Sequence, residues 1–221
     1  MRRVVLSAVV LVALLPLACQ GTPIWTEVGD AGNTLGGAQQ PSGVGPLTQI
    51  VGWFNVPGDT GGTWVDIYRI YVFNPIGFSA TTSGTGYDPA LFLFDLDGMG
   101  LEANQDISTT DQNAYLLGGD APPLEVYLMI AMNNRHPMSP AGSIFPDPML
   151  PSQLHYRTSP GGDQPFSNLG GSVIGSYPSP VNYTITLTGV QYIPEPASWI
   201  MLASGIALAS VFLRRRRRTR C

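Results

Sequence analysis

The chain has no lysine, and charged residues make up only 12% of its 221 residues. Its eleven arginines are unevenly placed, because eight of them lie within the first three and the last eight positions. Between residues 24 and 190 there are fourteen acidic residues and three arginines, which gives this central part a net charge near −11. Nucleic acids are bound mainly through cationic side chains that displace counterions from phosphates. The composition therefore argues against nucleic-acid binding.

Cysteine and histidine are equally scarce. The two cysteines, Cys19 and Cys221, lie in the end segments, so the central part has no disulfide framework and depends on its hydrophobic core. The two histidines, His136 and His155, are nineteen positions apart and have no neighbouring cysteine or serine motif of the G-x-S-x-G type. This argues against a zinc site and against a histidine-dependent nucleophile triad. We expect both histidines to be exposed in loops.

Glycine and proline are abundant, with 26 and 20 residues, and no amphipathic helix is evident between residues 24 and 193. This composition is typical of short strands joined by many turns. Runs rich in β-branched and aromatic residues, separated by glycine and proline, predict strands within 47–56, 64–73, 90–94, 115–117, 125–132 and 183–188.

The last of these runs has the clearest period. Tyr183, Ile185 and Leu187 alternate with three threonines, which places apolar groups on one face of a strand and hydroxyl groups on the other. Sheets with one wetted face are usually antiparallel. The sequence therefore predicts an all-β body, an antiparallel β-sandwich or jelly roll, between two terminal segments of a different character.

The first terminal segment, residues 1–21, has the layout of a secretory signal peptide. Two arginines precede a fourteen-residue apolar run from Val4 to Leu17, and small residues follow. The run spans roughly 21 Å, which is short for a bilayer core of about 30 Å. We expect cleavage by signal peptidase between Ala18 and Gly21. Residues 15–19 also resemble a degraded lipoprotein signal, which leaves open whether Cys19 is lipidated.

The second terminal segment, residues 193–221, has three parts in a fixed order. Pro194, Glu195 and Pro196 end the preceding strand, and the apolar run 197–213 is long enough for one short transmembrane helix near 26 Å. The cationic cluster that follows favours the cytoplasmic side of a membrane and consists of Arg214, Arg215, Arg216, Arg217 and Arg218. This orientation places the body outside the cytoplasm.

These three parts together resemble the PEP-CTERM sorting signal of Gram-negative bacteria. The resemblance implies processing near Pro194, Glu195 and Pro196 by an exosortase, a membrane transpeptidase, and a link to exopolysaccharide and biofilm production. It also implies an exported protein that is anchored in the inner membrane before processing and reaches the cell surface or extracellular matrix afterwards. An ordinary C-terminal membrane anchor is the alternative, and it predicts the same topology without cleavage.

The body resembles the bacterial pre-peptidase C-terminal (PPC-like) domain over residues 47–190. The likeness lies in the segments 66–70, 87–95 with Gly98, and 183–189. It implies a β-sandwich that serves as an accessory module of secreted proteins. The chain departs from the usual pattern by a stretch at 133–181, whose 49 residues include nine prolines and six glycines. We interpret that stretch as a partly ordered insertion, and residues 22–46 as an irregular lead-in.

Calcium is the one ligand that the residue types suggest, because hard cations prefer carboxylate and carbonyl oxygens. The candidate ligands lie near the ends of predicted strands and are Asp88, Asp95, Asp97 and Asp106. The segment from Asp95 to Gly98 lacks a complete twelve-residue calcium loop, so a turn with capping aspartates is the alternative. No other cofactor is indicated.

For the function, we expect a non-catalytic exported surface or extracellular-matrix protein that contacts exopolysaccharide. Aromatic residues such as Trp25, Trp53 and Trp64 are able to stack on sugar rings, although in a sandwich they more often fill the core. The alternative is a secreted hydrolase of the glycosidase type that uses two of the many carboxylates. A purely structural component of the surface layer remains a third hypothesis.

Overall fold

The computed structural model describes residues 23–54, 64–84, 87–119, 122–132, 134–146, 149–156, 161–173 and 180–193. Within them the chain forms thirteen strands and one 3-10 helix, η1 (Leu35–Gly37). The signal-peptide prediction for 1–21 and the transmembrane helix predicted at 197–213 lie outside the described residues. In the described part of the chain, no helix is long and apolar enough to cross a membrane. The expected all-β architecture is confirmed.

The first sheet has five strands in the order β1-β2-β12-β4-β7. They are β1 (Ile24–Thr26), β2 (Gln49–Phe54), β12 (Val181–Thr188), β4 (Ser79–Ser83) and β7 (Tyr115–Leu117). All neighbours are antiparallel except β1 and β2, which run parallel. The predicted alternation of β12 is confirmed, because its apolar side chains are buried and its asparagine and threonines are not. One face of this sheet therefore contributes to a core.

The second sheet has five strands in the order β13-β3-β8-β5-β6, all antiparallel. They are β13 (Val190–Gln191), β3 (Val65–Val72), β8 (Leu124–Met132), β5 (Pro89–Phe94) and β6 (Gly100–Asn104). All six residues of β5 are buried, and β8 is buried from Leu128 to Met132. Burial of successive residues means that both faces of this sheet are covered.

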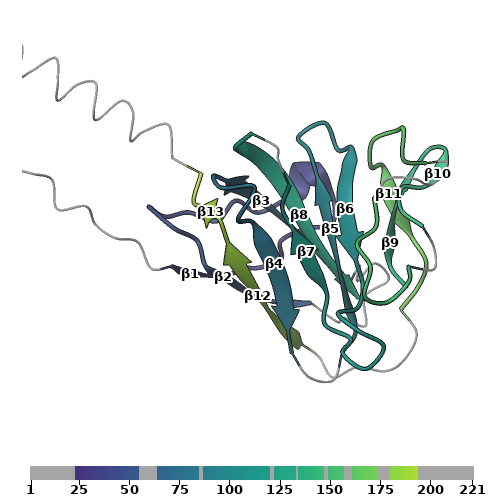
Figure 1. Cartoon of the computed structure of the whole chain (residues 1–221), viewed down its shortest axis with the longest axis horizontal. Helices are drawn as coiled ribbons and strands as arrows, with labels where there is room; N and C mark the ends of the chain where they lie inside the picture. Colours follow the sequence, from purple (N-terminus) through teal and green to yellow (C-terminus); the bar gives the residue numbers. More distant parts are fainter. Residues whose placement is uncertain are drawn as a thin grey trace, which may run out of the picture.

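One face of the second sheet packs on the first sheet. Their common core includes Ile50 and Ile185 of the first sheet and Tyr68, Leu91 and Leu128 of the second. Side chains alternate between the two faces of a strand, and these five residues enter the core because they lie on the inward face of their strands. The two layers form the antiparallel sandwich that the sequence predicts (Figure 1).

Part of the other face of the second sheet is covered by the insertion, which contains a small sheet of its own. Residues 133–181 contain a three-stranded antiparallel sheet made of β10 (Gly142–Ser143), β9 (His136–Ser139) and β11 (Asn168–Gly170). Ile144 and Phe145 of this segment are buried in a second core, and the Phe145 ring lies 5.6 Å from that of Phe92. The sequence did not indicate these short strands individually, because their apolar contacts are made with distant strands.

The lead-in is also part of the body. It contributes β1 to the first sheet, and the backbone of Gln39 bonds the edge of β3 through Ile67 O and Arg69 N. Ala31 is fully buried. In residues 23–46 the regular elements are β1 and η1, and single edge pairings such as these leave no periodic pattern in the sequence.

Candidate functional site

The four aspartates proposed as calcium ligands lie in two separate places. Asp88 precedes β5 and Asp95 follows it, so a six-residue strand of roughly 20 Å separates them. A calcium ion requires its ligand oxygens at about 2.3–2.6 Å. Asp106 lies beyond β6 at the end where Asp88 is found, because Asn104 pairs with Leu91. The structure therefore does not bring the four side chains together at one point.

Asp95 and Asp97 belong to a tight turn between β5 and β6. The Asp95 Oδ1 atom accepts hydrogen bonds from the backbone amides of Asp97 (3.0 Å) and Met99 (2.8 Å). Gly98 has a φ of 82°, a conformation that glycine adopts without strain. The carboxylate satisfies backbone donors of its own turn, which is the capping role that the sequence left open as the alternative.

Asp88 and Asp106 are both buried at the other end of these strands. Gln112 Nε2 donates a hydrogen bond of 3.1 Å to Asp88 Oδ2. Burial raises the pKa of Asp106, and the nearby charge of Asp111 adds to the rise. In the described part of the chain these aspartates do not belong to a group of three side chains with converging ligand atoms.

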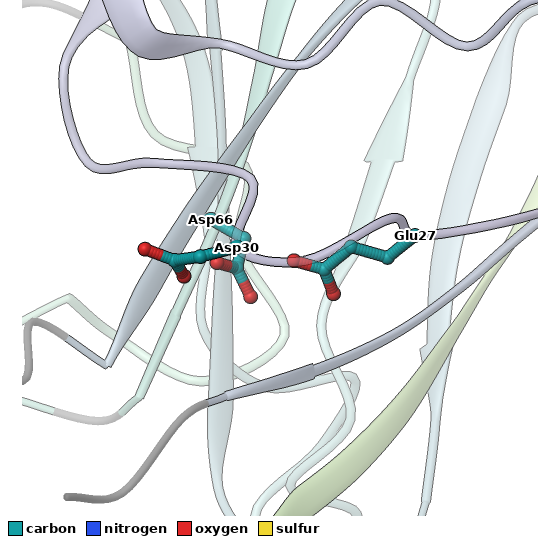
Figure 2. Close-up of side chains that lie close together, drawn as sticks. All are labelled: Glu27, Asp30 and Asp66. Carbon is teal, nitrogen blue, oxygen red and sulfur yellow. The ribbon is translucent and has the colours of Figure 1, made fainter.

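Such a group exists elsewhere, in residues that the sequence did not single out as ligands. The ligand atoms of Glu27, Asp30 and Asp66 all lie within 4.8 Å of one another, and Figure 2 shows the Glu27 carboxyl group extending toward the two aspartates. Glu27 and Asp30 come from the lead-in, and Asp66 comes from β3. Glu27 and Asp66 are 3% and 1% exposed, whereas Asp30 is exposed. We call these three residues the acidic cluster.

The carboxyl oxygens of Glu27 are occupied by the protein's own donors. Oε1 accepts a hydrogen bond from the Ala31 amide (2.7 Å), and Oε2 accepts one from the Trp53 amide (2.9 Å). These bonds tie the lead-in to β2. Because the amides supply fixed donors to both oxygens, Glu27 serves first as a structural link between two chain segments.

Asp66 is held by a chain of tyrosine hydroxyl groups inside the sandwich. Tyr183 donates its hydroxyl proton to Asp66 Oδ2 at 2.6 Å, and the hydroxyl oxygens of Tyr183 and Tyr68 are 2.5 Å apart. A side chain at Gly52 would collide with this network, since its Cβ would lie 2.5 Å from the Tyr183 hydroxyl and 2.6 Å from Glu27 Oε2. The absence of a side chain at position 52 gives the network its space.

The electrostatics of the acidic cluster favour protonation. Burial raises the pKa of Asp66 to about 8, the negative charge of Glu27 adds to the rise, and the hydrogen bond from Tyr183 opposes it. Burial also raises the pKa of Glu27. The charges that act on Asp66 are those of Glu27 and Asp30, both acidic. The pair Glu27 and Asp66 therefore holds a proton at neutral pH.

This arrangement is unsuited to sugar hydrolysis. A glycosidase needs two carboxyl groups on either side of a bound sugar, with at least one of them ionised. Here the two buried carboxyl groups lie within the fold, and their oxygens accept bonds from backbone amides and from Tyr183. A metal ion bound here would have to compete with these hydrogen-bond donors for the carboxyl oxygens.

The two histidines differ from each other. His155 is buried rather than exposed, because its backbone pairs with Ala103 at the edge of β6 and its Nε2 atom lies 3.0 Å from the Leu150 nitrogen. His136 begins β9. The expectation that both are exposed loop residues was therefore wrong, because His155 is buried and His136 is a half-buried strand residue. Neither belongs to a group of metal-binding residues in the described segments.

The tryptophans proposed as sugar contacts mostly pack against the core. Trp25 makes an edge contact with Tyr68 at 5.8 Å between ring centroids, and Trp64 lies 6.5 Å from Phe54. Trp53 is half-buried. These contacts identify Trp25 and Trp64 as structural residues.

A polar and aromatic surface was not anticipated from the sequence. It lies on the outer face of the second sheet, where Arg69 bonds Glu125 through Nε (2.9 Å) and Nη2. Tyr127 is paired with Arg69 across β3 and β8, and Tyr71 is paired with Glu125. All four side chains are half-buried. We call them the outer-face cluster. Their positions alternate with the core residues of the two strands, and that pattern was the available signal.

Comparison with known proteins identifies the end of the chain. A family model described as the PEP-CTERM protein-sorting motif matches residues 193–218, which include the Pro194, Glu195 and Pro196 string, the apolar run and the five arginines. The match begins at the last described residue, two positions after β13. No curated protein matches the chain.

Fold and motif together define a class of protein. The body is an all-β domain of antiparallel sheets, and the segment attached to it is a PEP-CTERM protein-sorting motif. The motif indicates an exported protein that is anchored in the membrane and then processed by an exosortase-like system.

Proposed function

We propose that this protein is a non-catalytic module of the cell surface or extracellular matrix of a Gram-negative bacterium, and that its body contacts exopolysaccharide. The observation on which this depends is the sorting motif at 193–218, placed directly after the last strand of a folded domain. With this arrangement, export and processing would leave the folded domain outside the cytoplasm as the mature protein. The likeness of the body to PPC-like accessory domains is part of the same proposal.

The chemistry of the described residues supports a non-catalytic body. The closest carboxyl groups, those of Glu27 and Asp66, are buried, and burial raises the pKa of both. Neither is accessible to a polymeric substrate. The buried His155 ring contacts the Leu150 backbone instead of a serine or carboxyl group. The placement of Glu27, Asp66 and His155 supports the non-catalytic proposal.

The outer-face cluster supports the contact with polysaccharide. Tyr71 and Tyr127 offer aromatic surface against which sugar rings can stack, and Arg69 and Glu125 offer hydrogen-bond donors and acceptors for hydroxyl groups. Because a β-sheet holds these side chains in a fixed register, they form a preorganised platform. An extended polymer would lie along this half-buried part of the sheet's outer face.

Export and processing are tested by expressing the whole chain in a Gram-negative host with its exosortase and in the same host without it. We expect a shortened product in the surface or medium fraction of the first host, and the uncut chain in the membrane fraction of the second. An uncut chain in the membrane of both hosts would identify the segment as a plain anchor. Mass spectrometry of each fraction distinguishes these results.

Polysaccharide contact is tested with the processed protein recovered from the medium. We expect it to co-sediment with the host's exopolysaccharide, and we expect Tyr71→Ala with Tyr127→Ala to weaken the binding at least tenfold. Tyr156→Ala is the control, because Tyr156 is 58% exposed and lies in the insertion. Release of reducing sugars by the protein would support the hydrolase. If the protein neither bound the polysaccharide nor released sugars from it, that result would support the hypothesis of a purely structural surface component.

A further inference from the structure

Both ends of the body leave from the same place. The amide of Leu47 donates a hydrogen bond to Val190 O (3.0 Å), and the next amide, that of Thr48, donates to Pro23 O (2.6 Å). Pro23 is the first described residue, and Val190 begins the last strand. The two ends of the body therefore both bond the two residues that precede β2. In Figure 1, β1 and β13 accordingly appear on the same side of the molecule.

The last residues before the sorting motif run beside a turn of the lead-in. Pro46 pairs with Gln191, and the amide of Tyr192 donates a hydrogen bond to Gly45 O (3.1 Å). The Tyr192 ring packs so closely on Gly43 that a Cβ there would lie 2.7 Å from it. Val44 therefore lies next to the point where the chain leaves the body at Ile193.

Apolar side chains are exposed along this side. Val44 is 60% exposed, and Ile24 of β1 is 47% exposed. Ile24 follows Pro23, whose carbonyl accepts hydrogen bonds from the amides of Thr48 and Gln49. We call Val44 and Ile24 the exit edge.

The covalent connection determines which partner is within reach. Only three residues, 194–196, separate Ile193 from the apolar run that begins at residue 197. Three extended residues span about 10 Å. While the sorting segment is anchored in the membrane, the exit edge is thus held at the bilayer surface. No other part of the described body is tied to the membrane by so short a link.

We propose that the exit edge is a membrane-contact surface, on which the body rests against the lipid headgroups until the sorting segment is processed. The inference rests on the proposed function in one respect, since it requires the sorting segment to be membrane-anchored. Apolar side chains that reach the headgroup region gain free energy by leaving water. The contact fixes the orientation of the body and keeps the Pro194, Glu195 and Pro196 string at the membrane surface.

The test uses the full chain, produced without exosortase and reconstituted into phosphatidylethanolamine and phosphatidylglycerol vesicles. The described body contains no cysteine, so after Cys19→Ser and Cys221→Ser a single label can be attached through Val44→Cys. Leu150→Cys is the matched control. Leu150 is 55% exposed and lies beside His155 at β6, four strands away from β13. Nitroxide-labelled lipids then report the contact by quenching the attached fluorophore.

We expect at least threefold stronger quenching of the label at position 44 than of the label at position 150. Equal quenching in chains that float with the vesicles would overturn the membrane contact and leave the proposed function intact. Chains that do not float would overturn both, because the anchor itself would be missing. Excimer emission from pyrene at position 44 that persists in detergent would assign this edge to a second copy of the chain instead.

Discussion

At the scale of single residues, Asp66 shows how a charged side chain is accommodated inside this sandwich. It shares the inward face of β3 with Tyr68 and Ile70. The charges that act on it are acidic, so binding a proton, and not pairing with a cation, is what lowers the cost of burying this carboxyl group. The hydrogen bond from Tyr183 orients the carboxyl group but does not offset its burial. The cost of this arrangement depends on pH.

The sign of that dependence follows from proton binding. An unfolded chain releases the Asp66 proton near pH 3.8, whereas the folded chain retains it up to about pH 8. Between these values the folded state binds more protons than the unfolded state, so the free energy of unfolding falls as the pH rises. The fall amounts to at most about 1.4 kcal/mol per pH unit and ends once the folded group has ionised. The raised pKa of Glu27 acts in the same direction.

We expect Asp66→Asn to remove most of this dependence. Asparagine keeps the shape of the side chain and can still accept the hydrogen bond from Tyr183. Urea unfolding of both proteins between pH 5 and 9 measures the effect: the wild type should lose stability across this range more steeply than the variant. The variant should be the more stable protein at pH 9.

Asp97→Asn is the control, because it removes a carboxyl group at an exposed turn. Its pH profile should follow that of the wild type. Parallel profiles for Asp66→Asn and the wild type would show that Asp66 is ionised in the fold throughout this range.

Gly52 provides a second test at this scale. An added methyl group would lie within 2.6 Å of both the Tyr183 hydroxyl and Glu27 Oε2. We expect Gly52→Ala to lower the free energy of unfolding by about 1–3 kcal/mol, as overpacked cores do. Gly36→Ala is the matched control, since nothing lies within 4 Å of its added Cβ. If Gly52→Ala changed the free energy of unfolding no more than Gly36→Ala, the hydrogen-bond network would be able to accommodate the added methyl group.

At the scale of elements, the insertion is the segment that gives the second sheet its buried outer face. Phe145 is its anchor, with ring contacts to Phe92 at 5.6 Å and to Phe94 at 5.9 Å. Without this cover, the apolar side chains of β5 that face away from the sandwich would be exposed to water. The insertion therefore contributes to stability in addition to any binding role.

We expect Phe145→Ala to destabilise the protein by about 3–5 kcal/mol, because it leaves a cavity beneath the insertion. Leu96→Ala, at a side chain that is 46% exposed, should change the free energy of unfolding by less than about 0.5 kcal/mol. Hydrogen exchange adds a spatial readout. Amides of β9 and β11 should lose protection in Phe145→Ala while those of β12 keep theirs. If protection were lost equally in all three sheets, the insertion would not open independently of the sandwich.

At the scale of the whole molecule, export and architecture are connected through the exit edge. The body has both of its connections on one side, so its opposite side, with the β9–β11 sheet, is the part farthest from them in Figure 1. A domain tethered in this way presents the insertion away from its membrane link, whereas the outer-face cluster begins beside that link, because Tyr71 pairs with Gln191. Processing then releases the domain without any need to unfold it.

The sorting motif itself is tested by changing Pro194, Glu195 and Pro196 to alanine in the full chain. We expect the uncut chain to accumulate in the membrane fraction, with a mass larger than that of the processed wild type. The string Pro146, Asp147 and Pro148 is a matched control, because it has the same proline–acid–proline chemistry within the insertion. Alanine substitutions there should leave processing unchanged. Normal processing of the first variant would show that these three residues are not recognised.

Much of the sandwich could be predicted from local pattern. The six predicted runs correspond to β2, β3, β5, β7, β8 and β12. The strands that were missed are short or polar, as in the Ser-Ala-Thr-Thr-Ser segment of β4 and the Gly-Leu-Glu-Ala-Asn segment of β6. Their residues are ordered by pairing with neighbours far along the chain, and such pairing has no local signal.

The candidate site was less predictable. Aspartates near strand ends suggested a common ligand, but the antiparallel arrangement of β5 and β6 distributes them over two ends. The acidic cluster was missed because Glu27 and Asp66 are 39 positions apart and meet only when the lead-in crosses the sandwich. A charged residue within the apolar run 64–73 was the one clue, since alternation places Asp66 on the inward face with Tyr68.

The sequence alone determined the export signals and the strand period, because a sorting machinery recognises a linear segment and a strand's alternation is a property of consecutive residues. Tertiary structure alone decided that apolar side chains are buried on both faces of the second sheet, that burial beside Glu27 raises the pKa of Asp66, and that both connections leave on one side. These features depend on which distant segments pack together. Such packing depends on contacts between residues far apart in the chain, so it cannot be deduced from a local sequence pattern.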